Sequence, residues 1–415
     1  MNEVGRRIRR RVERSLNAFR VVIVTGPRQC GKTTLVRQIL ADRPGTFRSL
    51  DDSRVLAAAL VDPAGFVQYG APPRAIDEIQ FGGDALVRSI KFEVDREPKP
   101  GQYLLTGSTD FLTVPGLSES LAGRAVLLDL WPFSQGELHG TPDGFVDVAF
   151  RDPESLRQGS SSKFRPLDYL NLMCAGGYPE AVKLETEDRT MWFDSLIQTI
   201  TQRDVADLTG ARRAAELPRL LAILAARTAS ELVVSQINAD FGLARHTTED
   251  YIGFLRMTNL IREVPPWATS HATRAKRRRK IHLTDTGMVS HLLGADADAL
   301  LRPEDRRRGP LTETFVVNEL RKQLTWSSAR AELLHFRDHN REIDVILETP
   351  DARVVAIEIK SGLTVDGGAF RHLADLRDKL GDAFVHGFVV GFGETPLPFG
   401  DRLTSIPLSY LWEAG

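Results

Sequence analysis

The chain has 415 residues, of which 42% are hydrophobic and 26% are charged, a balance typical of a folded protein with two or three domains. Its formal net charge is −1, so there is no global positive field, and any contact with nucleic acid has to come from local basic patches. The two cysteines, Cys30 and Cys174, are too few for a disulfide framework or a Cys-based zinc site and favour a reducing compartment.

The sequence also argues against a membrane or secreted protein. No stretch approaches the roughly 18 apolar residues that a membrane span requires. The charged N-terminus is not followed by the apolar region of a secretory signal. We therefore expect a cytoplasmic protein that makes no membrane contact.

The first part of the chain, residues 1–160, is predicted to form an α/β domain. Apolar residues at spacings of three and four predict a helix over 6–19, and a β-branched run predicts a buried strand over 20–25. A glycine loop and a helix over 33–40 follow. Further strands are expected to end at 75–78 and 102–108, with another over 125–130. Strands that alternate with helices favour a parallel, doubly wound sheet.

The middle part, residues 161–308, begins near a polar linker at 158–163 and is predicted to be mainly helical. Two helices, 235–241 and 245–257, are joined by a turn that contains glycine, as in a helix-turn-helix. Two short strand runs then predict a wing, and the basic segment 274–280 lies between them. The two runs cover residues 260–264 and 280–283.

The last part, residues 309–415, is predicted to be a compact αβ domain. Its expected elements are a helix over 311–323, strands over 342–347 and 354–359, a helix over 369–380 and a strand over 387–390. The fold class predicted for the whole chain is therefore α/β, with a P-loop domain, a helical and winged-helix middle and a C-terminal αβ domain.

The strongest motif is the P-loop pattern G-x-x-x-x-G-K-[ST], which follows a predicted strand and opens a predicted helix. Its backbone N–H groups and the helix N-terminus attract phosphate, the lysine adds a point charge, and the hydroxyl can ligate Mg²⁺. The sequence therefore predicts that ATP binds here together with Mg²⁺. The residues expected to contact the nucleotide are Gly26, Pro27, Arg28, Gln29, Cys30, Gly31, Lys32, Thr33 and Thr34.

A pair of acidic residues, Asp77 and Glu78, follows the second predicted strand. Asp77 is predicted to hold Mg²⁺ together with Thr33, and Glu78 to orient or deprotonate the attacking water. The alternative is an ordinary acidic loop. The preceding run Pro72-Pro73-Arg74 is a poor strand, which leaves hydrolysis less well supported than binding.

Two further residues are candidates for contact with the γ-phosphate. Ser108 ends the next predicted strand, where a polar sensor of that phosphate would lie, and a plain turn is an equal alternative. Arg124 is a candidate arginine finger, acting in its own subunit or in a neighbouring one. A solvated surface arginine is the alternative. Action on a neighbour would require a homo-oligomer.

The second informative pattern is a set of charged residues in the C-terminal part. Glu358 and Lys360 are two apart on a predicted strand and share a face, and Asp344 on the neighbouring strand can face them. Glu313, on the preceding helix, is a candidate third acid. Two or three carboxylates with a lysine are the arrangement of a Mg²⁺-dependent nuclease, in which the acids bind metal and Lys360 acts in catalysis. The alternative is a charged face that is merely solvated.

The joint order of motifs resembles a known family, the bacterial and archaeal AAA-type (AAA+) ATPases with a C-terminal domain of unknown function and a restriction-endonuclease-like, PD-(D/E)XK, fold. The resemblance spans nearly the whole chain. It is carried by residues 25–33, 76–80, 105–108, 121–124, 176–180, 285–287, 313–316, 342–344 and 358–360.

The resemblance implies an AAA+ core, a winged-helix middle and a nuclease-like end. It supports Arg124 as a functional position and Glu313 as the first acid of a nuclease-type set, and it places Arg337 near the same pocket. It implies no settled physiological role, and cleavage by the nuclease-like domain stays open.

The basic segment 274–280 bears on the choice of partner. In a winged-helix wing it would lie near a DNA backbone, and a solvated loop is the alternative. The leading hypothesis is an ATP-driven protein that handles DNA and has a possible nuclease site. The competing hypothesis is an ATP-dependent switch whose nuclease-like domain is inactive and binds a partner.

Overall fold

The computed structural model describes residues 4–108, 121–201, 216–338 and 340–415. Contacts divide the chain into an N-terminal unit, residues 1–133 with 254–260, and a C-terminal unit, residues 134–253 with 261–415. The mixed α/β class with a parallel N-terminal sheet, predicted from the sequence, is confirmed.

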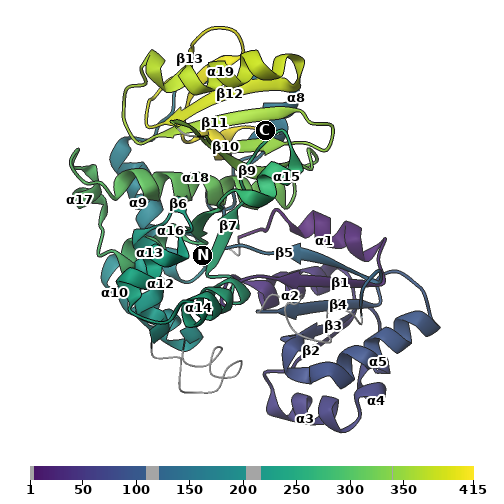
Figure 1. Ribbon diagram of the computed structural model, residues 1–415. Helices are drawn as coiled ribbons and strands as arrows, with labels where there is room; N and C mark the ends of the chain where they lie inside the picture. The colour runs from purple at the N-terminus through teal and green to yellow at the C-terminus, as the bar shows by residue number, and fades with distance from the viewer. Residues whose placement is uncertain (1–3, 109–120, 202–215, 339) are drawn as a thin grey trace. The chain divides into compact units, whose positions relative to one another are not determined.

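The N-terminal unit is built on a five-stranded sheet with the order β2-β3-β4-β1-β5, in which every neighbouring pair is parallel. Figure 1 shows these strands side by side, with β1 between β4 and β5. The apolar runs of β1 and β4 are buried along their whole length, as expected for central parallel strands. The elements are α1 Arg9–Leu16, β1 Val21–Thr25, α2 Lys32–Asp42, β2 Thr46–Ser49, α3 Ser53–Val61, α4 Pro63–Gln68, β3 Arg74–Asp77, η1 Ile79–Gly82, α5 Gly83–Arg96, β4 Tyr103–Gly107 and β5 Ala125–Asp129.

The residues before Asp77, which the sequence analysis judged a poor strand, do end in a short strand, β3. Strand β3 begins at Arg74, directly after the two prolines, so neither proline interrupts the sheet. Its residues pair with β2 on one side and with β4 on the other. Because the sheet is parallel, β1 and β3 both end at the same edge, and the P-loop and Asp77 meet there.

The C-terminal unit contains helices, a three-stranded sheet with the order β6-β8-β7, and a six-stranded sheet with the order β13-β14-β12-β11-β10-β9. The first elements are α7 Gln135–His139, α8 Phe145–Arg151, η3 Pro153–Arg157, α9 Pro166–Ala175, η4 Ala181–Lys183, α10 Thr186–Thr199, α12 Leu217–Ala226, β6 Ser230–Glu231, α13 Val234–Phe241, α14 Arg245–Met257, β7 Ile261–Val264, α15 His271–Lys276, β8 Lys280–Leu283, α16 Thr286–Leu292 and α17 Ala297–Leu301.

The six-stranded sheet is mixed. Strands β9, β10 and β11 are antiparallel, whereas β11, β12 and β14 are parallel. Helix α19 packs on it through the buried residues Leu373 and Leu376. Figure 1 shows α19 along one side of this sheet. The elements are α18 Arg308–Leu324, β9 Glu332–Asp338, β10 Arg341–Glu348, β11 Val354–Lys360, η7 Gly367–Phe370, α19 Arg371–Leu380, η8 Gly381–Ala383, β12 Phe384–Gly391, β13 Leu397–Pro398, β14 Leu403–Pro407 and α20 Tyr410–Glu413.

Two of the sequence motifs, residues 176–180 and 285–287, contact each other inside the C-terminal unit. The buried carboxylate of Asp285 accepts a hydrogen bond from the backbone N–H of Gly177 at 2.7 Å and one from that of Met288 at 3.0 Å. Gly176 adopts φ +71°, and a Cβ atom there would lie 2.3 Å from the Asp285 Oδ1 atom. Glycine is therefore required at this position for both backbone conformation and space.

The bounds of the two units differ from the domain boundaries predicted at residues 160 and 308. Residues 134–160 lie in the C-terminal unit because buried backbone groups there bond to α18. The N–H of Gln135 donates to Glu319 at 2.8 Å, and the N–H of Val146 donates to Gln323 at 3.1 Å. The predicted middle and last domains also share one unit.

None of the helices in the described ranges combines the length and apolar character that crossing a membrane requires.

Candidate functional site

The P-loop closes around its own lysine. Gly31 has φ +99°, a left-handed conformation suited to glycine, and α2 begins at the next residue. The ammonium of Lys32 is buried and donates to the carbonyls of Gly26 at 3.0 Å and Pro27 at 2.8 Å. It therefore lies within the loop, where phosphate oxygens can replace the two carbonyls as acceptors.

The carboxylate of Asp77 lies at the centre of a set of hydroxyl groups. It accepts hydrogen bonds from Thr33 at 3.0 Å, from Ser49 at 3.2 Å and from the buried Thr106. The structure thus brings Asp77 and Thr33 together, as the sequence predicts. Hard oxygen ligands of this kind suit Mg²⁺ that also binds nucleotide phosphates.

Glu78 is held in an unusual backbone conformation with φ +54°. Its N–H donates to the Thr106 hydroxyl at 3.1 Å, and its side chain accepts a hydrogen bond from Gln80. Gln80 also donates to the Ser108 hydroxyl at 3.1 Å. A non-glycine residue in this region costs on the order of 1–3 kcal/mol and is typical of functional sites. Gln80 thus connects Glu78 to the end of β4.

Sequence reasoning missed two residues of this site, Ser49 and Asp51. Ser49 ends β2 and Asp51 follows it, and the sequence analysis does not predict this strand. Burial, together with the nearby charges of Glu78 and Asp77, raises the pKa of Asp51. The signal that was available is topological, because every parallel strand of the sheet ends at the edge where the P-loop lies.

The other residues predicted to contact the nucleotide lie along the P-loop and in the first turn of α2. Arg28 is partly buried, Gln29 is exposed with φ +59°, and Thr34 is exposed on α2. Cys30 is buried beside the carbonyl of Leu130, and burial raises the pKa of its thiol. Their contact with a nucleotide stays a prediction.

Arg124 lies at the end of the sheet where β1 begins, opposite the end where the P-loop lies. Because Val21 pairs with Ala125, Arg124 is level with the start of β1, roughly 20 Å along the strand from the P-loop. Its guanidinium makes two hydrogen bonds to Asp95, at 2.6 and 2.8 Å. Action of Arg124 on the phosphates of its own subunit is therefore excluded in this arrangement, and action in a neighbouring subunit stays a prediction.

In the C-terminal unit, two of the predicted acidic residues, Glu313 and Asp344, lie beside a lysine that sequence reasoning did not select. The side chain of Lys280, on β8, is 1% exposed and lies 2.7 Å from Glu313, 2.9 Å from Glu342 and 3.6 Å from Asp344. We call these four residues the Lys280 cluster. The sequence placed Lys280 only at the end of a basic run.

The two remaining predicted residues lie next to this cluster. Strand pairing brings Asp344 beside Glu358, and the Asp344 carboxylate accepts a hydrogen bond from the N–H of Ile359 at 2.8 Å. Glu358 pairs with Lys360 at 2.7 Å through one oxygen, while its other oxygen is buried without a hydrogen-bond partner. The structure therefore does bring together the acids and the lysine that the sequence grouped.

The electrostatics follow from burial and crowding. Burial and the charge of Asp344 raise the pKa of Glu313 to about 8 and that of Glu358 to about 7. Burial acts to lower the pKa of Lys280, but the charges of Glu313, Asp344 and Glu342 outweigh it, so this pKa is raised. Lys280 consequently remains a cation among the carboxylates.

This arrangement departs from the predicted metal site formed by Glu313, Asp344 and Glu358. Over the described ranges, no group of three or more His, Cys, Asp or Glu residues is placed to hold a metal ion. The physical reason is that the Lys280 ammonium lies against Glu313 and Asp344, where a cation would have to bind.

The basic segment 274–280 is largely packed into the C-terminal unit, which departs from the solvated loop that the sequence analysis gave as one alternative. Arg274 pairs with Glu348 at 2.6 Å, Arg277 pairs with Asp338 at 3.1 Å, and Lys280 is buried. Part of the segment forms helix α15. Three basic side chains remain exposed, those of Lys276, Arg278 and Arg279.

Comparison with known proteins divides the chain into three matched regions. Residues 18–139 match the family described as an AAA domain, and residues 167–299 and 308–411 match two domains of unknown function. The AAA match supports an AAA-type ATPase, with ATP binding and hydrolysis. The restriction-endonuclease-like character of the last region and the winged-helix character of the middle stay predictions.

Two relatives that match nearly the whole chain, and several solved structures, are also similar to it. Uncharacterized proteins of Mycobacterium bovis and Mycobacterium tuberculosis are each 29% identical over 409 residues, which is 98% of this chain and 84% of theirs. The Walker-type ATPase of Pyrococcus abyssi matches with a TM-score of 0.40 and 17% identity, covering 69% of this chain and 94% of that one.

Proposed function

We propose that the chain binds ATP with Mg²⁺ at the P-loop and hydrolyses it, using Glu78 to position the attacking water. The observation that carries this proposal is the Asp77 carboxylate, which accepts hydrogen bonds from the hydroxyls of Thr33 and Thr106 and stands next to Glu78. When bound, Mg²⁺ would neutralise charge on the phosphates. Lys32 would donate to the phosphates, and Ser108, through Gln80, would link Glu78 to the end of β4.

The experiment compares two variants in nucleotide binding and turnover. Lys32→Ala is expected to lose ATP binding. Glu78→Gln is expected to retain binding and to lose turnover by about 10²- to 10⁴-fold, the range for a general base. Asp84→Asn, an exposed acid in the first turn of α5, is the matched control and should behave as wild type. Normal turnover by Glu78→Gln would show that the base is assigned to the wrong residue.

For the C-terminal part, the geometry favours the switch hypothesis over a nuclease. The Lys280 ammonium pairs with Glu313 and Asp344, two of the acids that a Mg²⁺-dependent nuclease would need. We therefore propose that ATP state controls a C-terminal region that binds its partner without cutting it. Plasmid nicking with Mg²⁺ or Mn²⁺ should be the same for wild type and Asp344→Ala. Nicking that disappears in Asp344→Ala would establish the nuclease.

The partner we propose is DNA, contacted by the exposed basic side chains of residues 276–279. Arginine and lysine at a surface neutralise phosphates without reading sequence. ATP turnover measured with and without DNA tests this coupling. We expect DNA to change the rate of ATP turnover. If turnover at saturating DNA equals turnover without DNA, DNA is not the partner that ATP state controls.

A further inference from the structure

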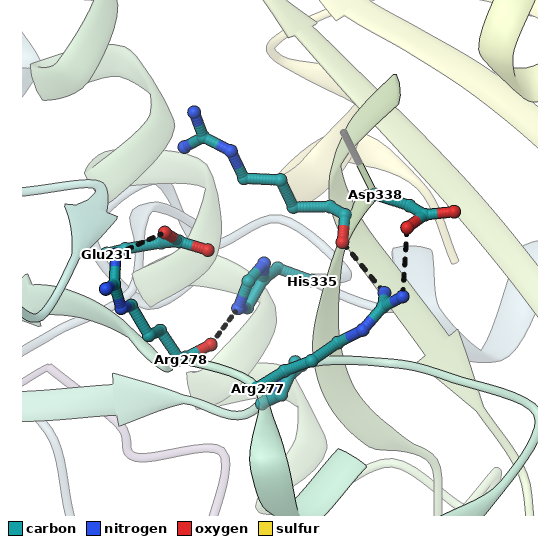
Figure 2. Close-up of a pocket in the computed structure, with 7 residues that line it drawn as sticks. Glu231, Arg277, Arg278, His335 and Asp338 are labelled. Atoms are coloured by element: carbon teal, nitrogen blue, oxygen red, sulfur yellow. Dashed lines mark hydrogen bonds and ion pairs between the residues drawn. The ribbon is translucent and has the colours of Figure 1, made fainter. Parts of the chain in front are cut away.

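A small pocket lies where the basic segment meets the first strand of the six-stranded sheet (Figure 2). Its volume is about 250 Å³. Pockets that enclose drug-sized molecules are typically ~300–1,000 Å³, so this one suits a single small group with its waters. The lining residues are Glu231, Pro266, Arg277, Arg278, His335, Arg337 and Asp338.

Hydrogen bonds fix the walls of this pocket. The N–H of His335 donates to the carbonyl of Pro265 at 3.0 Å, and the N–H of Trp267 donates to the carbonyl of His335 at 2.6 Å. Arg277 donates to the carbonyl of Arg337 at 2.8 Å and to Asp338 at 3.1 Å, as Figure 2 shows for the last pair. Two segments distant in sequence are thereby joined before any ligand binds.

Two of the arginines retain donors for a ligand. Arg278 lies 3.9 Å from Glu231, and Arg337 lies 4.0 Å from Glu342, distances beyond hydrogen-bond range. Their side chains are 61% and 46% exposed. A guanidinium presents a planar fork of donors that matches phosphate oxygens.

His335 provides a second, independent sign of a ligand. Its ring is 1% exposed, and its Nε2 atom lies 3.1 Å from the carbonyl of Arg278, so Nε2 must carry the hydrogen. Figure 2 shows the ring directed at that carbonyl. The other ring nitrogen, Nδ1, is buried without a partner. A buried acceptor left without a donor is costly, and a water held by a bound group would satisfy it.

We propose that this pocket binds a backbone phosphate of a nucleic-acid strand through Arg278 and Arg337, an inference that rests on the DNA contact proposed above. The carboxylates of the lining do not prevent this. Asp338 is paired with Arg277 and lies 3.4 Å from Arg341. Glu231 has a weak contact with Arg278 that a phosphate can replace.

The basic side chains next to the pocket in sequence favour a strand over a free phosphate ion. The exposed side chains of Lys276 and Arg279 flank the pocket in sequence, and Arg279 is 60% exposed. Neither side chain lines the pocket, so they offer cations in addition to those that one phosphate in the pocket contacts. A chain of phosphates can contact several of them at once, whereas a single ion can contact only those in the pocket.

Fluorescence anisotropy with a labelled DNA duplex tests the proposal on the full-length protein. Arg278→Gln and Arg337→Gln are each expected to weaken binding about tenfold, and the double variant should lower the slope of log affinity against log salt by about two. Arg302→Gln, at an exposed arginine of the same unit, is the matched control. Urea denaturation of each variant, compared with wild type, verifies that the C-terminal unit is folded.

The proposal is overturned if the double variant binds DNA with the affinity and salt slope of Arg302→Gln. A second arm uses inorganic phosphate and follows the imidazole signals of His335 by NMR. If wild type binds no duplex but phosphate shifts these signals, and the double variant shows no shift, the pocket takes free phosphate and the strand is excluded. That result would also contradict the proposed DNA contact. The proposal of ATP hydrolysis is tested separately by the P-loop variants.

Discussion

A single buried lysine organises the acidic residues of the C-terminal unit. Lys280 has three carboxylate neighbours within 3.6 Å and almost no contact with solvent. Removing two charges from water is costly, and the geometry repays this only when the pair is complete. The cluster therefore has a large effect on stability when one partner is lost, although the intact cluster need not stabilise the fold strongly.

Replacement of this lysine tests the point. Lys280→Met should lower the free energy of unfolding by about 3–5 kcal/mol, because Glu342 and Asp344 are left without their cation. Urea denaturation measures the loss. Adding Glu342→Gln to Lys280→Met removes one of these charges and should recover part of the loss. Lys360→Met, which alters a side chain that is 43% exposed, is the control and should cost far less. Equal losses in the two single variants would contradict the cluster's importance.

The functional residues differ in how far sequence reveals them. The P-loop and Asp77 can be identified because their spacing and order are themselves constrained by phosphate and Mg²⁺. Lys280 cannot, because a buried, paired lysine and a solvated one have the same sequence neighbours. The same ambiguity affects Arg274 and Arg277, which the sequence assigned to an exposed basic run and the structure pairs with carboxylates.

At the scale of elements, the connection between the segment 134–143 and helix α18 depends on a buried carboxylate. Asp143 is fully buried and accepts hydrogen bonds from Ser134 and, at 3.1 Å, from Gln323. Burial and the charge of Glu319 raise its pKa to about 7. In the folded chain the protonated form is therefore favoured up to about pH 7, whereas in the unfolded chain the group ionises near pH 4.

This pKa difference predicts a pH dependence of stability. Below about pH 4 both states are protonated and the contribution is fully present. As pH rises to about 7 the unfolded state alone loses its proton, so the free energy of unfolding falls, by at most about 4 kcal/mol. Asp143→Asn mimics the protonated group and should remove this decline. Because Glu358 and Glu313 contribute with the same sign, the measurement is the difference between the two urea-denaturation profiles from pH 4 to 8. Parallel profiles would contradict the assignment.

Elements with a clear apolar period are predicted well from the sequence. Strand β8, Lys280–Leu283, and helix α14, Arg245–Met257, agree with the predicted bounds. Strands β2, β9 and β14 are missed. Strand β2, at Thr46–Ser49, is short and only partly buried, so its residues carry little apolar signal. Its place in the sheet comes from pairing with β3, which local sequence does not encode.

At the scale of the whole molecule, the sequence predicted three domains, whereas contacts define two units. Local composition marks linkers well, but unit boundaries depend on buried contacts between distant residues. The Lys280 cluster joins β8 to β10 and α18 across the predicted boundary at 308. A polar stretch such as 158–163 therefore marks a change of local structure without separating two folded bodies.

The position of Arg124 leads to a prediction about assembly. In its own subunit Arg124 lies at the edge of the sheet opposite the P-loop and pairs with Asp95, so it cannot reach the phosphates there. Any catalytic role requires a second copy of the chain.

At dilutions where the protein is monomeric, Arg124→Ala and wild type should hydrolyse ATP at the same rate. At concentrations where it assembles, wild type should be faster. Mixing Arg124→Ala with Lys32→Ala should then restore part of the faster rate that neither variant reaches alone, since Lys32→Ala supplies the arginine and Arg124→Ala supplies the nucleotide site. Turnover followed against protein concentration measures both regimes. A loss in the Arg124→Ala monomer would contradict the geometry, and equal rates at every concentration would remove Arg124 from catalysis.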